Sequence, residues 1–414
     1  MRNNMKKPRL RILSSTSSIV IGAVLMTMLS STSAAADQAT TKNADADEIS
    51  VSLSPSPQIK TRDNSYSVRL AGFFQFDHAE NSAETASVRD ASTIRRGRIG
   101  VRGVFAKDWK YDFMVETGRD GAEVFDANIA YTGLKNFAVT VGQFKEPLGL
   151  EWSTGCPWWS FMDRALIASL TPNRSIGVAA TTGGDKWRIH AGHFPSNTSN
   201  AKARPENGVT TGRAYITPVN SKRNVLHLGI SGSIRNPDVE TRSVRFKGKH
   251  ETAAPGKPTV DTGPITDIDR TTVMGVEALG IFGPLSIQAE YIDNVVHREN
   301  AATLNFTSFY FQTSWFITGE VRSYKLKRGG FARVKPKKGS KIGAIQLAAR
   351  YDKLDLNDKD VAGGSVDRYT VGLNWHPNTN IRLTANYIRS NTDENAPAAN
   401  DTRNTAAFRA QYAF

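Results

Sequence analysis

Apolar and polar side chains alternate along most of the chain downstream of Tyr66. The alternation is clearest in residues 68–77, 109–116, 125–131, 285–291, 369–375 and 381–387. A period of two predicts β-strands that have one apolar face. We count about sixteen such segments, which suits a single large β-barrel. The pattern therefore predicts an all-β chain.

The C-terminal segment indicates whether the apolar face meets protein, water or lipid. Phe408, Tyr412 and Phe414 share one face of this segment, and Arg409 and Gln411 occupy the other. In lipid every backbone donor and acceptor must be satisfied within the protein, so a sheet persists there only if it closes on itself. We therefore predict a transmembrane antiparallel β-barrel of about 16 strands over residues 63–414. We also expect the barrel-assembly machinery to recognise the terminal Phe414. A soluble β-sandwich and a secreted β-solenoid are the alternatives.

The N-terminus has the pattern of an export signal. Five basic residues and no acidic one lie within residues 1–11, an apolar stretch follows at 19–26, and small residues follow at 34–36. This order is typical of a secretory signal peptide, and we predict cleavage after residue 36. An uncleaved anchor is the alternative, but the apolar stretch is shorter than the about 20 residues that a bilayer requires. The polar residues 37–62 are predicted to form a flexible segment.

The connections between the predicted strands differ in length. Residues 194–210, 235–270, 322–340 and 391–405 are long and polar, as outer loops are, and short turns are expected on the periplasmic side. The segment 145–173 is instead rich in aromatic residues, which an exposed loop rarely needs. We therefore predict that it folds into the lumen as a constriction loop.

A cluster of arginines lies on one predicted strand. Arg96, Arg98 and Arg102 share a face, and because an arginine facing lipid near the midplane costs about 2–4 kcal/mol, they are predicted to face the lumen. Arg95 falls on the opposite face and needs a strand end or a β-bulge to join them. Guanidinium groups are always charged and donate in a forked geometry that fits phosphate and carboxylate oxygens. The cluster thus predicts a filter for anions.

Further cations are predicted to extend the positive field of the lumen. In or beside the constriction loop they are Lys145, Arg164 and Arg174, and on the wall they are Arg213, Arg350, Arg382 and Arg409. Without the signal peptide the chain keeps 48 of its 53 basic residues against 39 acidic ones, a net charge of +9 that attracts anions. The alternative is that the arginines only pair with lumen acids such as Asp77, Glu116 and Asp126.

The basic stretch 322–341 is predicted to be an outer loop that attracts anions or binds lipopolysaccharide phosphates, or is merely solvated. The export signal argues against nucleic acid as a partner.

A barrel enzyme is a remote alternative, because His190 and His193 take opposite faces of a strand and no nucleophile elbow or metal-ligand spacing accompanies them. We expect no catalytic residue, metal or cofactor, and Cys156, the single cysteine, cannot form an internal disulfide.

Two blocks carry a resemblance to a known family. The first is Val141-Gly-Gln-Phe-Lys-Glu-Pro-Leu-Gly-Leu-Glu151 with Phe161-Met-Asp-Arg-Ala-Leu166. The second is Ser314-Trp-Phe-Ile-Thr-Gly-Glu320 with Phe331-Ala-Arg-Val-Lys-Pro336 and Leu347-Ala-Ala-Arg-Tyr-Asp352. From about Tyr66 to Phe414 the sequence resembles the phosphate-selective porin O and P family.

The resemblance implies a sixteen-stranded, homotrimeric barrel in the outer membrane of a Gram-negative bacterium. It further implies that an inward loop and wall arginines hold phosphate or pyrophosphate at a constriction, with Arg95, Arg96 and Arg98 at the matching positions. Members of proven phosphate selectivity carry lysines in that loop, whereas residues 155–160 contain none. A general diffusion porin with a weak anion preference is therefore a second interpretation.

Overall fold

A computed structural model describes residues 48–414 except 85–87, 119–120, 172–173, 198–205 and 249–257. The chain divides into two units, Met1–Glu48 and Ile49–Phe414. The predicted signal peptide and most of the segment that follows it lie outside the described residues. No helix among the described residues is long and apolar enough to cross a membrane.

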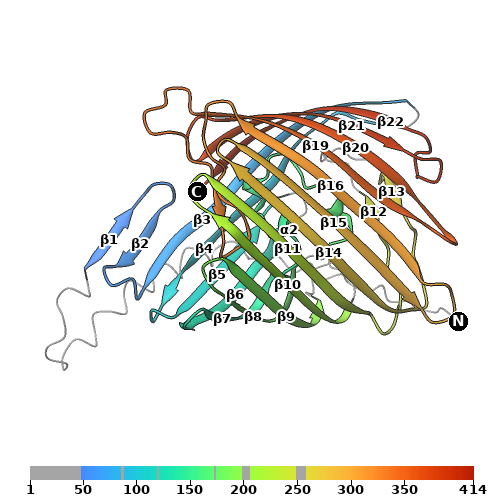
Figure 1. The fold of residues 1–414 in the computed structure, drawn as a ribbon, viewed down its shortest axis with the longest axis horizontal. Helices are drawn as coiled ribbons and strands as arrows, with labels where there is room; N and C mark the ends of the chain where they lie inside the picture. Colours follow the sequence, from blue (N-terminus) through green and yellow to red (C-terminus); the bar gives the residue numbers. More distant parts are fainter. Residues whose placement is uncertain (1–47, 85–87, 119–120, 172–173, 198–205, 249–257) are drawn as a thin grey trace, which may run out of the picture. The chain divides into compact units, whose positions relative to one another are not determined.

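The second unit is built around a closed antiparallel barrel (Figure 1). In the described chain its sixteen strands are β3 (Ser67–Ala83), β4 (Ala91–Phe105), β5 (Trp109–Glu116), β6 (Glu123–Leu134), β7 (Phe137–Lys145), β8 (Arg174–Gly183), β9 (Trp187–Asn197), β10 (Glu206–Asn220), β11 (Asn224–Pro237), β14 (Ile268–Phe282), β15 (Leu285–Arg298), β16 (Leu304–Phe316), β19 (Ala344–Asp358), β20 (Val361–His376), β21 (Ile381–Thr392) and β22 (Thr402–Ala413). Neighbours in this order pair with each other, and β22 pairs with β3, with Phe408 opposite His78. The predicted fold class is confirmed.

Alternation decides which side chains face outward. On β22 Phe408 is 50% exposed on the outside of the barrel, whereas its neighbour Arg409 is 2% exposed on the inside. On β20 Val371 is 56% exposed, whereas Arg368 and Thr370 are buried. An apolar outer face and a polar inner face are what a barrel in lipid requires, because only the inner face meets water.

Two short strands precede the barrel. β1 (Ile49–Ser52) and β2 (Gln58–Thr61) form a hairpin, and β2 pairs with the first residues of β3. The sequence predicted a flexible segment over 37–62, whereas residues 49–61 of it contain these paired strands. The hairpin continues the sheet beyond the C-terminal end of β22 (Figure 1).

The connections at the two ends of the barrel differ. The end that holds Phe414, which we call the turn end, carries the short connections 106–108, 135–136, 184–186, 221–223, 283–284 and 377–380. The long connection 317–343 also starts there, because β16 ends beside the 283–284 turn, where the Phe316 amide donates to the Pro284 carbonyl. The prediction that 322–340 is an outer loop is therefore wrong. Charge composition does not tell at which end a connection lies.

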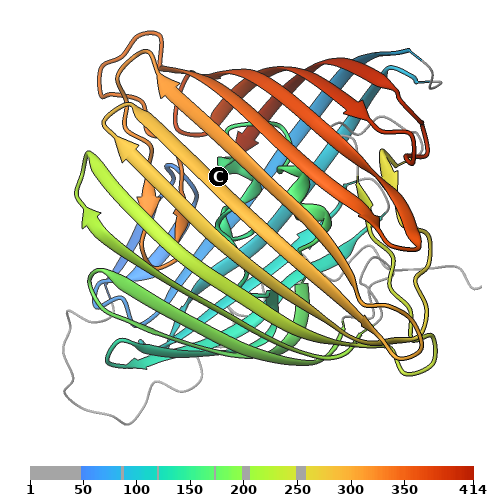
Figure 2. The same ribbon diagram turned by 45° about the vertical axis from the view of Figure 1, so that its right-hand side comes forward.

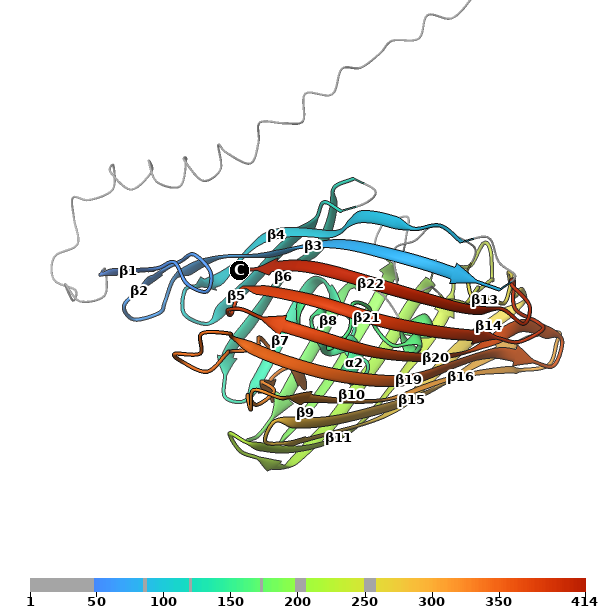
Figure 3. The same ribbon diagram turned by 90° about the horizontal axis from the view of Figure 1, so that it is seen from above.

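Two connections from the end opposite the short turns pack inside the barrel. Residues 146–173, which contain α2 (Leu150–Ser153), lie inside the ring of strands in Figure 2. Residues 238–267, with β12 (Lys247–Gly248) and β13 (Val260–Asp261), come from the opposite end to the short turns. Figure 3 shows the same inner segments from above. Apolar side chains of 146–173, 238–267 and the wall form one buried cluster, which fixes these segments in place.

Candidate functional site

The connection between β7 and β8, residues 146–173, is called the inner loop. After α2 it forms two 3₁₀ turns, Cys156–Trp158 and Leu166–Ser169. Several of its apolar side chains are at most 1% exposed, among them Leu148, Leu150, Phe161 and Met162. The predicted inward packing of this segment is confirmed.

One arginine from each of four consecutive strands holds the backbone of the inner loop. We call Arg350 (β19), Arg368 (β20), Arg382 (β21) and Arg409 (β22) the wall arginines. They donate, in that order, to the carbonyls of Asp163, Arg164, Trp159 and Met162. The wall arginines are only 2–4% exposed, so they lie between the loop and the wall. Three of the four were predicted to add to the positive field of the lumen, but their donors bind the loop.

Carboxylates of the wall accept the loop's backbone N–H groups. Asp352 accepts from the Leu166 amide at 2.7 Å, and Glu290 accepts from the amides of Leu150 and Glu151. Because each of these groups is buried, an unmade hydrogen bond would be costly. The inner loop is thus attached to the wall through both its carbonyls and its amides.

The arginine cluster on β4 attaches the other side of the loop. Gln75 pairs with Arg96 and Phe76 with Ile94, so Arg95 is an extra residue in a bulge, one of the two arrangements that the sequence analysis allowed. Arg96 donates to Asp163 at 2.5 Å, and Arg95 donates to both oxygens of the same carboxylate. Burial opposes ionisation of Asp163, but Arg95 and Arg96 hold the net pKa of this carboxyl well below its ordinary value.

Four more of the predicted arginines have acidic partners. Arg98 binds Glu116 at 2.7 Å, Arg102 binds Asp112 at 2.8 Å, Arg174 binds Asp126 at 2.8 Å and Arg409 binds Asp77 at 2.7 Å. All three acids proposed as partners from the sequence are therefore paired. Each such pair reduces the net charge that its arginine presents to a solute.

An aromatic ring separates two of these pairs. The guanidinium carbons of Arg98 and Arg174 lie 3.7 and 3.6 Å from the ring centroid of Phe125. Alternation in 125–131 places Phe125 on the outer face with Ile129. The structure instead has a bulge there, since Met114 pairs with Asp126 and Val115 with Val124. The bulge turns the ring inward, where it contacts two like-charged groups.

Two of the predicted constriction cations differ from the others in that group, because no carboxylate in the described chain lies within ion-pair distance of Lys145 or Arg164. The wall residue Arg382 likewise donates to uncharged groups, the Trp159 carbonyl and the Gln411 amide oxygen. The Arg164 guanidinium lies over the indoles of Trp152 and Trp159, at 4.1 and 4.5 Å. Its buried Nε has no hydrogen-bond partner among the described residues. The Lys145 ammonium donates to the Trp152 carbonyl at 2.8 Å and lies 5.1 Å from the same indole. The donors of these two groups are thus not taken up by carboxylates of the described chain.

The positive field converges on the inner loop near Cys156. Burial raises the pKa of this thiol, but Arg98, Arg96, Lys145 and Arg164 outweigh burial, and the net pKa lies below its ordinary value. The thiol therefore reports a position at which negative charge is stabilised. Sequence reasoning assigned Cys156 no role.

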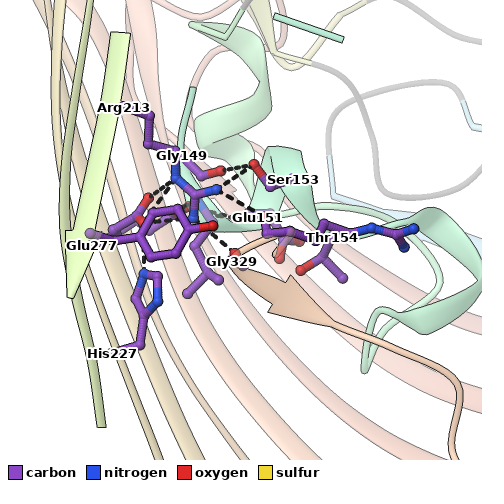
Figure 4. Close-up of polar contacts among 12 residues, drawn as sticks. Gly149, Glu151, Ser153, Thr154, Arg213, His227, Glu277 and Gly329 are labelled. Atoms are coloured by element: carbon purple, nitrogen blue, oxygen red, sulfur yellow. Dashed lines mark hydrogen bonds and ion pairs between the residues drawn. The ribbon is translucent and has the colours of Figure 1, made fainter. Parts of the chain in front are cut away.

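The remaining predicted residue, Arg213, lies elsewhere and joins two lumen segments to the wall (Figure 4). Several residues that shape the site were not predicted: Arg368, Phe125, Trp152, Asp352 and Glu290. Alternation on β20 places Arg368 inward and could have identified it. No sequence signal identified the carboxylates that receive the loop amides.

A family model described as phosphate-selective porin O and P matches residues 65–414. Porin O of Pseudomonas aeruginosa is 26% identical over 377 residues, covering 81% of this chain and 86% of that protein. An uncharacterized protein of Caulobacter vibrioides is 29% identical over 352 residues, covering 80% of this chain and 70% of that protein.

Solved structures share the fold at low identity. An anion-selective porin from Comamonas acidovorans matches with a TM-score of 0.55 and 12% identity, covering 84% of this chain and all of that one. OmpT of Vibrio cholerae in its trimer form matches with a TM-score of 0.53 and 13% identity, again over 84% of this chain and all of that one. At such identities the likeness concerns the fold alone.

Proposed function

We propose that this chain, which belongs to the phosphate-selective porin O and P family, is a passive channel that admits multivalent oxyanions through a constriction at Lys145 and Arg164. The chain is an outer-membrane porin of a Gram-negative bacterium, and its family and fold are those of channels. The finer claim concerns which solutes pass and which residues select them.

The single observation that carries the proposal is that, among the described residues, Arg164 and Lys145 have no carboxylate partner while every other predicted constriction cation has one. Stacking on Trp152 and Trp159 holds the Arg164 guanidinium by its faces. Its forked donor edge therefore remains available for an oxyanion. Phosphate and pyrophosphate fit such a site, because each carries several oxygens and more than one negative charge.

A second candidate function is general diffusion with a weak anion preference. It is favoured by the ion pairs of Arg98, Arg102 and Arg174, which reduce the net positive charge of the wall. The two functions differ in one property, because only a channel with an anion site is blocked by a slowly passing anion.

Planar bilayer recordings test the proposal. In a potassium chloride gradient the reversal potential of the wild type should indicate anion preference, and added phosphate or pyrophosphate should block the chloride current. The double variant K145A/R164A should shift the reversal potential toward zero. Losing a charge-assisted hydrogen bond costs about 1.5–3 kcal/mol, so block should weaken about 10-fold or more.

Arg389→Ala is the matched control, because Arg389 is exposed on the outer face of β21. It should leave both readouts at their wild-type values. Phosphate block that persists unchanged in K145A/R164A would refute the proposed site. A wild type that lacks any block would leave general diffusion as the function.

The proposal extends to assembly and partners. A homotrimer is supported by the trimer form recorded for OmpT, and cross-linking of the purified protein tests it. Recognition of Phe414 by the barrel-assembly machinery and contact with lipopolysaccharide remain part of the proposal. Residues 322–341 are not offered for lipopolysaccharide, since that segment leaves the barrel at the turn end.

A further inference from the structure

We infer that Arg213 is a positioning residue that joins the inner loop to a second inward segment, residues 317–343, and thereby sets the aperture of the constriction. This inference rests on the proposed function, and it assigns Arg213 a role other than adding to the positive field. The two segments enter the lumen from opposite ends of the barrel.

Arg213 uses all five of its donors. Its Nε and Nη2 donate to Glu277 of β14, and Nη2 also donates to the Gly329 carbonyl at 2.8 Å. Its Nη1 donates to the Ser153 hydroxyl at 2.8 Å and to the Arg328 carbonyl at 3.2 Å. Figure 4 shows this side chain between α2 and the strand that carries Glu277. One guanidinium thus bonds to the wall and to both lumen segments.

The second segment is built to lie against the inner loop. It forms a small hairpin from β17 (Tyr324–Lys325) and β18 (Gly330–Phe331). The Phe331 amide donates to the Thr154 hydroxyl, and Arg322 donates to the Ser160 hydroxyl at 2.7 Å and to the Trp158 carbonyl. Phe331 also packs in a buried cluster with Leu150 of the inner loop.

Further hydrogen bonds fix the partners of Arg213. His227 of β11 lies 2.7 Å from Glu277 on one side and 2.7 Å from the Tyr324 hydroxyl on the other. The Tyr215 hydroxyl donates to the Leu326 carbonyl at 2.7 Å. The hairpin is therefore tied to the wall at several points, and α2 is tied to the hairpin through Arg213.

Burial and pairing exclude a direct role for the charge of Arg213. Its side chain is 1% exposed and that of Glu277 is 2% exposed, at a distance of 2.6 Å. A buried pair with no net charge contributes little to the field that a solute meets. The position of the Arg213 side chain does matter, because it holds Ser153, which follows Trp152 in the chain. The Trp152 carbonyl and ring contact Lys145, and the same ring contacts Arg164. A displaced α2 would displace both proposed anion ligands.

The test compares R213K with R213A. Lysine keeps the charge but cannot reach the wall and both segments at once, since an ammonium is a single point with three donors. If Arg213 positions the loop, both variants should weaken phosphate block about 10-fold and admit larger neutral polymers into the pore, because charge-assisted hydrogen bonds to the loop are lost. S153A removes the hydroxyl that accepts from Arg213, together with the hydrogen bond that this hydroxyl donates to the Gly149 carbonyl, and it leaves the other contacts of Arg213 in place. It should change both readouts less, in the same direction.

R298K is the matched control. Arg298 makes a similar forked pair with Asp360 and donates to the Ala302 carbonyl, away from the inner loop. It should leave block and polymer exclusion at wild-type values. Electrophoretic mobility of unheated samples shows which variants retain a folded barrel, and S153A carries the test if R213A does not fold.

Two results would overturn the inference. In one, R213K has the phosphate block and polymer exclusion of the wild type while R213A has a reduced anion preference. This would mean that Arg213 acts through its charge. The other is wild-type block and polymer exclusion in R213K, R213A and S153A alike. Failure of the proposed function is a separate outcome, because it is read from K145A/R164A, in which Arg213 is intact.

Discussion

Cations on the two sides of the inner loop are held by different groups. The wall arginines donate to loop carbonyls and are almost completely buried. On the lumen side, Arg98, Arg174 and Arg164 lie on the aromatic rings of Phe125, Trp152 and Trp159, and Arg164 has no acidic partner in the described chain.

This difference shows that the number of inward-facing arginines does not measure the strength of an anion filter. A guanidinium whose donors are taken up by carbonyls and carboxylates of the protein acts as a structural cross-link. A guanidinium held by its flat faces keeps its donor edge for a solute. The predictions below separate these two roles.

The largest effect is expected from Asp163→Ala, which removes the carboxylate that attaches the loop to Arg95 and Arg96. Breaking a buried ion pair costs about 3–5 kcal/mol, so the free energy of unfolding in urea should fall by about that amount. The exposed turn residue Asp185 supplies the control, since Asp185→Ala should unfold like the wild type. Equal stability of Asp163→Ala and the wild type would contradict this role.

The same carboxylate determines a pH dependence. Burial raises the pKa of Asp163, but its arginine partners lower it further, so the net pKa lies below the ordinary 3.8. Stabilisation by a depressed carboxyl is present above the unfolded-state pKa and is lost only as the pH falls through the folded-state pKa. The melting temperature difference between the wild type and Asp163→Asn should therefore be equal at pH 7 and pH 5. A difference that shrinks between these values would contradict the assignment.

A pair of substitutions compares the two sides directly. Arg382→Met leaves the buried Trp159 carbonyl without its donor and should lower the free energy of unfolding by about 1–3 kcal/mol while anion preference persists. Arg164→Met loses two cation–π contacts, which contribute about 0.5–2 kcal/mol each, and it should in addition reduce phosphate block. Urea unfolding and bilayer recordings on both variants measure these effects. Weakened phosphate block in Arg382→Met together with wild-type block in Arg164→Met would contradict the assigned roles.

Cys156 lies where the field of the lumen-side cations converges, so a negative charge there should compete with solute anions. Cys156→Asp should weaken phosphate block by on the order of 1 kcal/mol, about fivefold, whereas the neutral Cys156→Ser should not. Block is measured as the phosphate concentration that halves the chloride current. Equal block in the two variants would place the thiol outside the anion path.

The smallest effect is expected from Phe125→Leu, which removes the ring shared by Arg98 and Arg174. Cation–π contacts contribute about 0.5–2 kcal/mol each, and both guanidinium groups keep their carboxylates, so anion preference should fall only slightly. Phe76→Leu, on the outer face, is the control for loss of a ring. A reversal potential in Phe125→Leu as small as in K145A/R164A would show that the ring does more than support its neighbours.

Much of the architecture could be predicted from local pattern. Alternation identified the inward positions of Arg213, Arg350, Arg382 and Arg409. The phase of Arg95 relative to Arg96 indicated a strand end or a bulge, and the bulge is present. The aromatic content of 145–173 indicated its inward packing. The end at which 317–343 lies was predicted wrongly, because it depends on the parity of all preceding strands and not on local composition.

The local sequence pattern could not identify which cations lack a carboxylate partner. Arg95 and Asp163 are 68 residues apart, and Arg409 and Met162 are 247 apart. Such partners follow from barrel closure and from the path of the inner loop, neither of which is encoded in the spacing of neighbouring residues.

The sequence by itself determined an all-β chain with an apolar and a polar face, since a period of two and the cost of charge in lipid act residue by residue. Only the tertiary structure decided which positive charges remain unneutralised, because neutralisation depends on what each guanidinium meets across the lumen. Arg350 meets a carbonyl and Arg98 a carboxylate, whereas Arg164 meets two indoles and no carboxylate of the described chain.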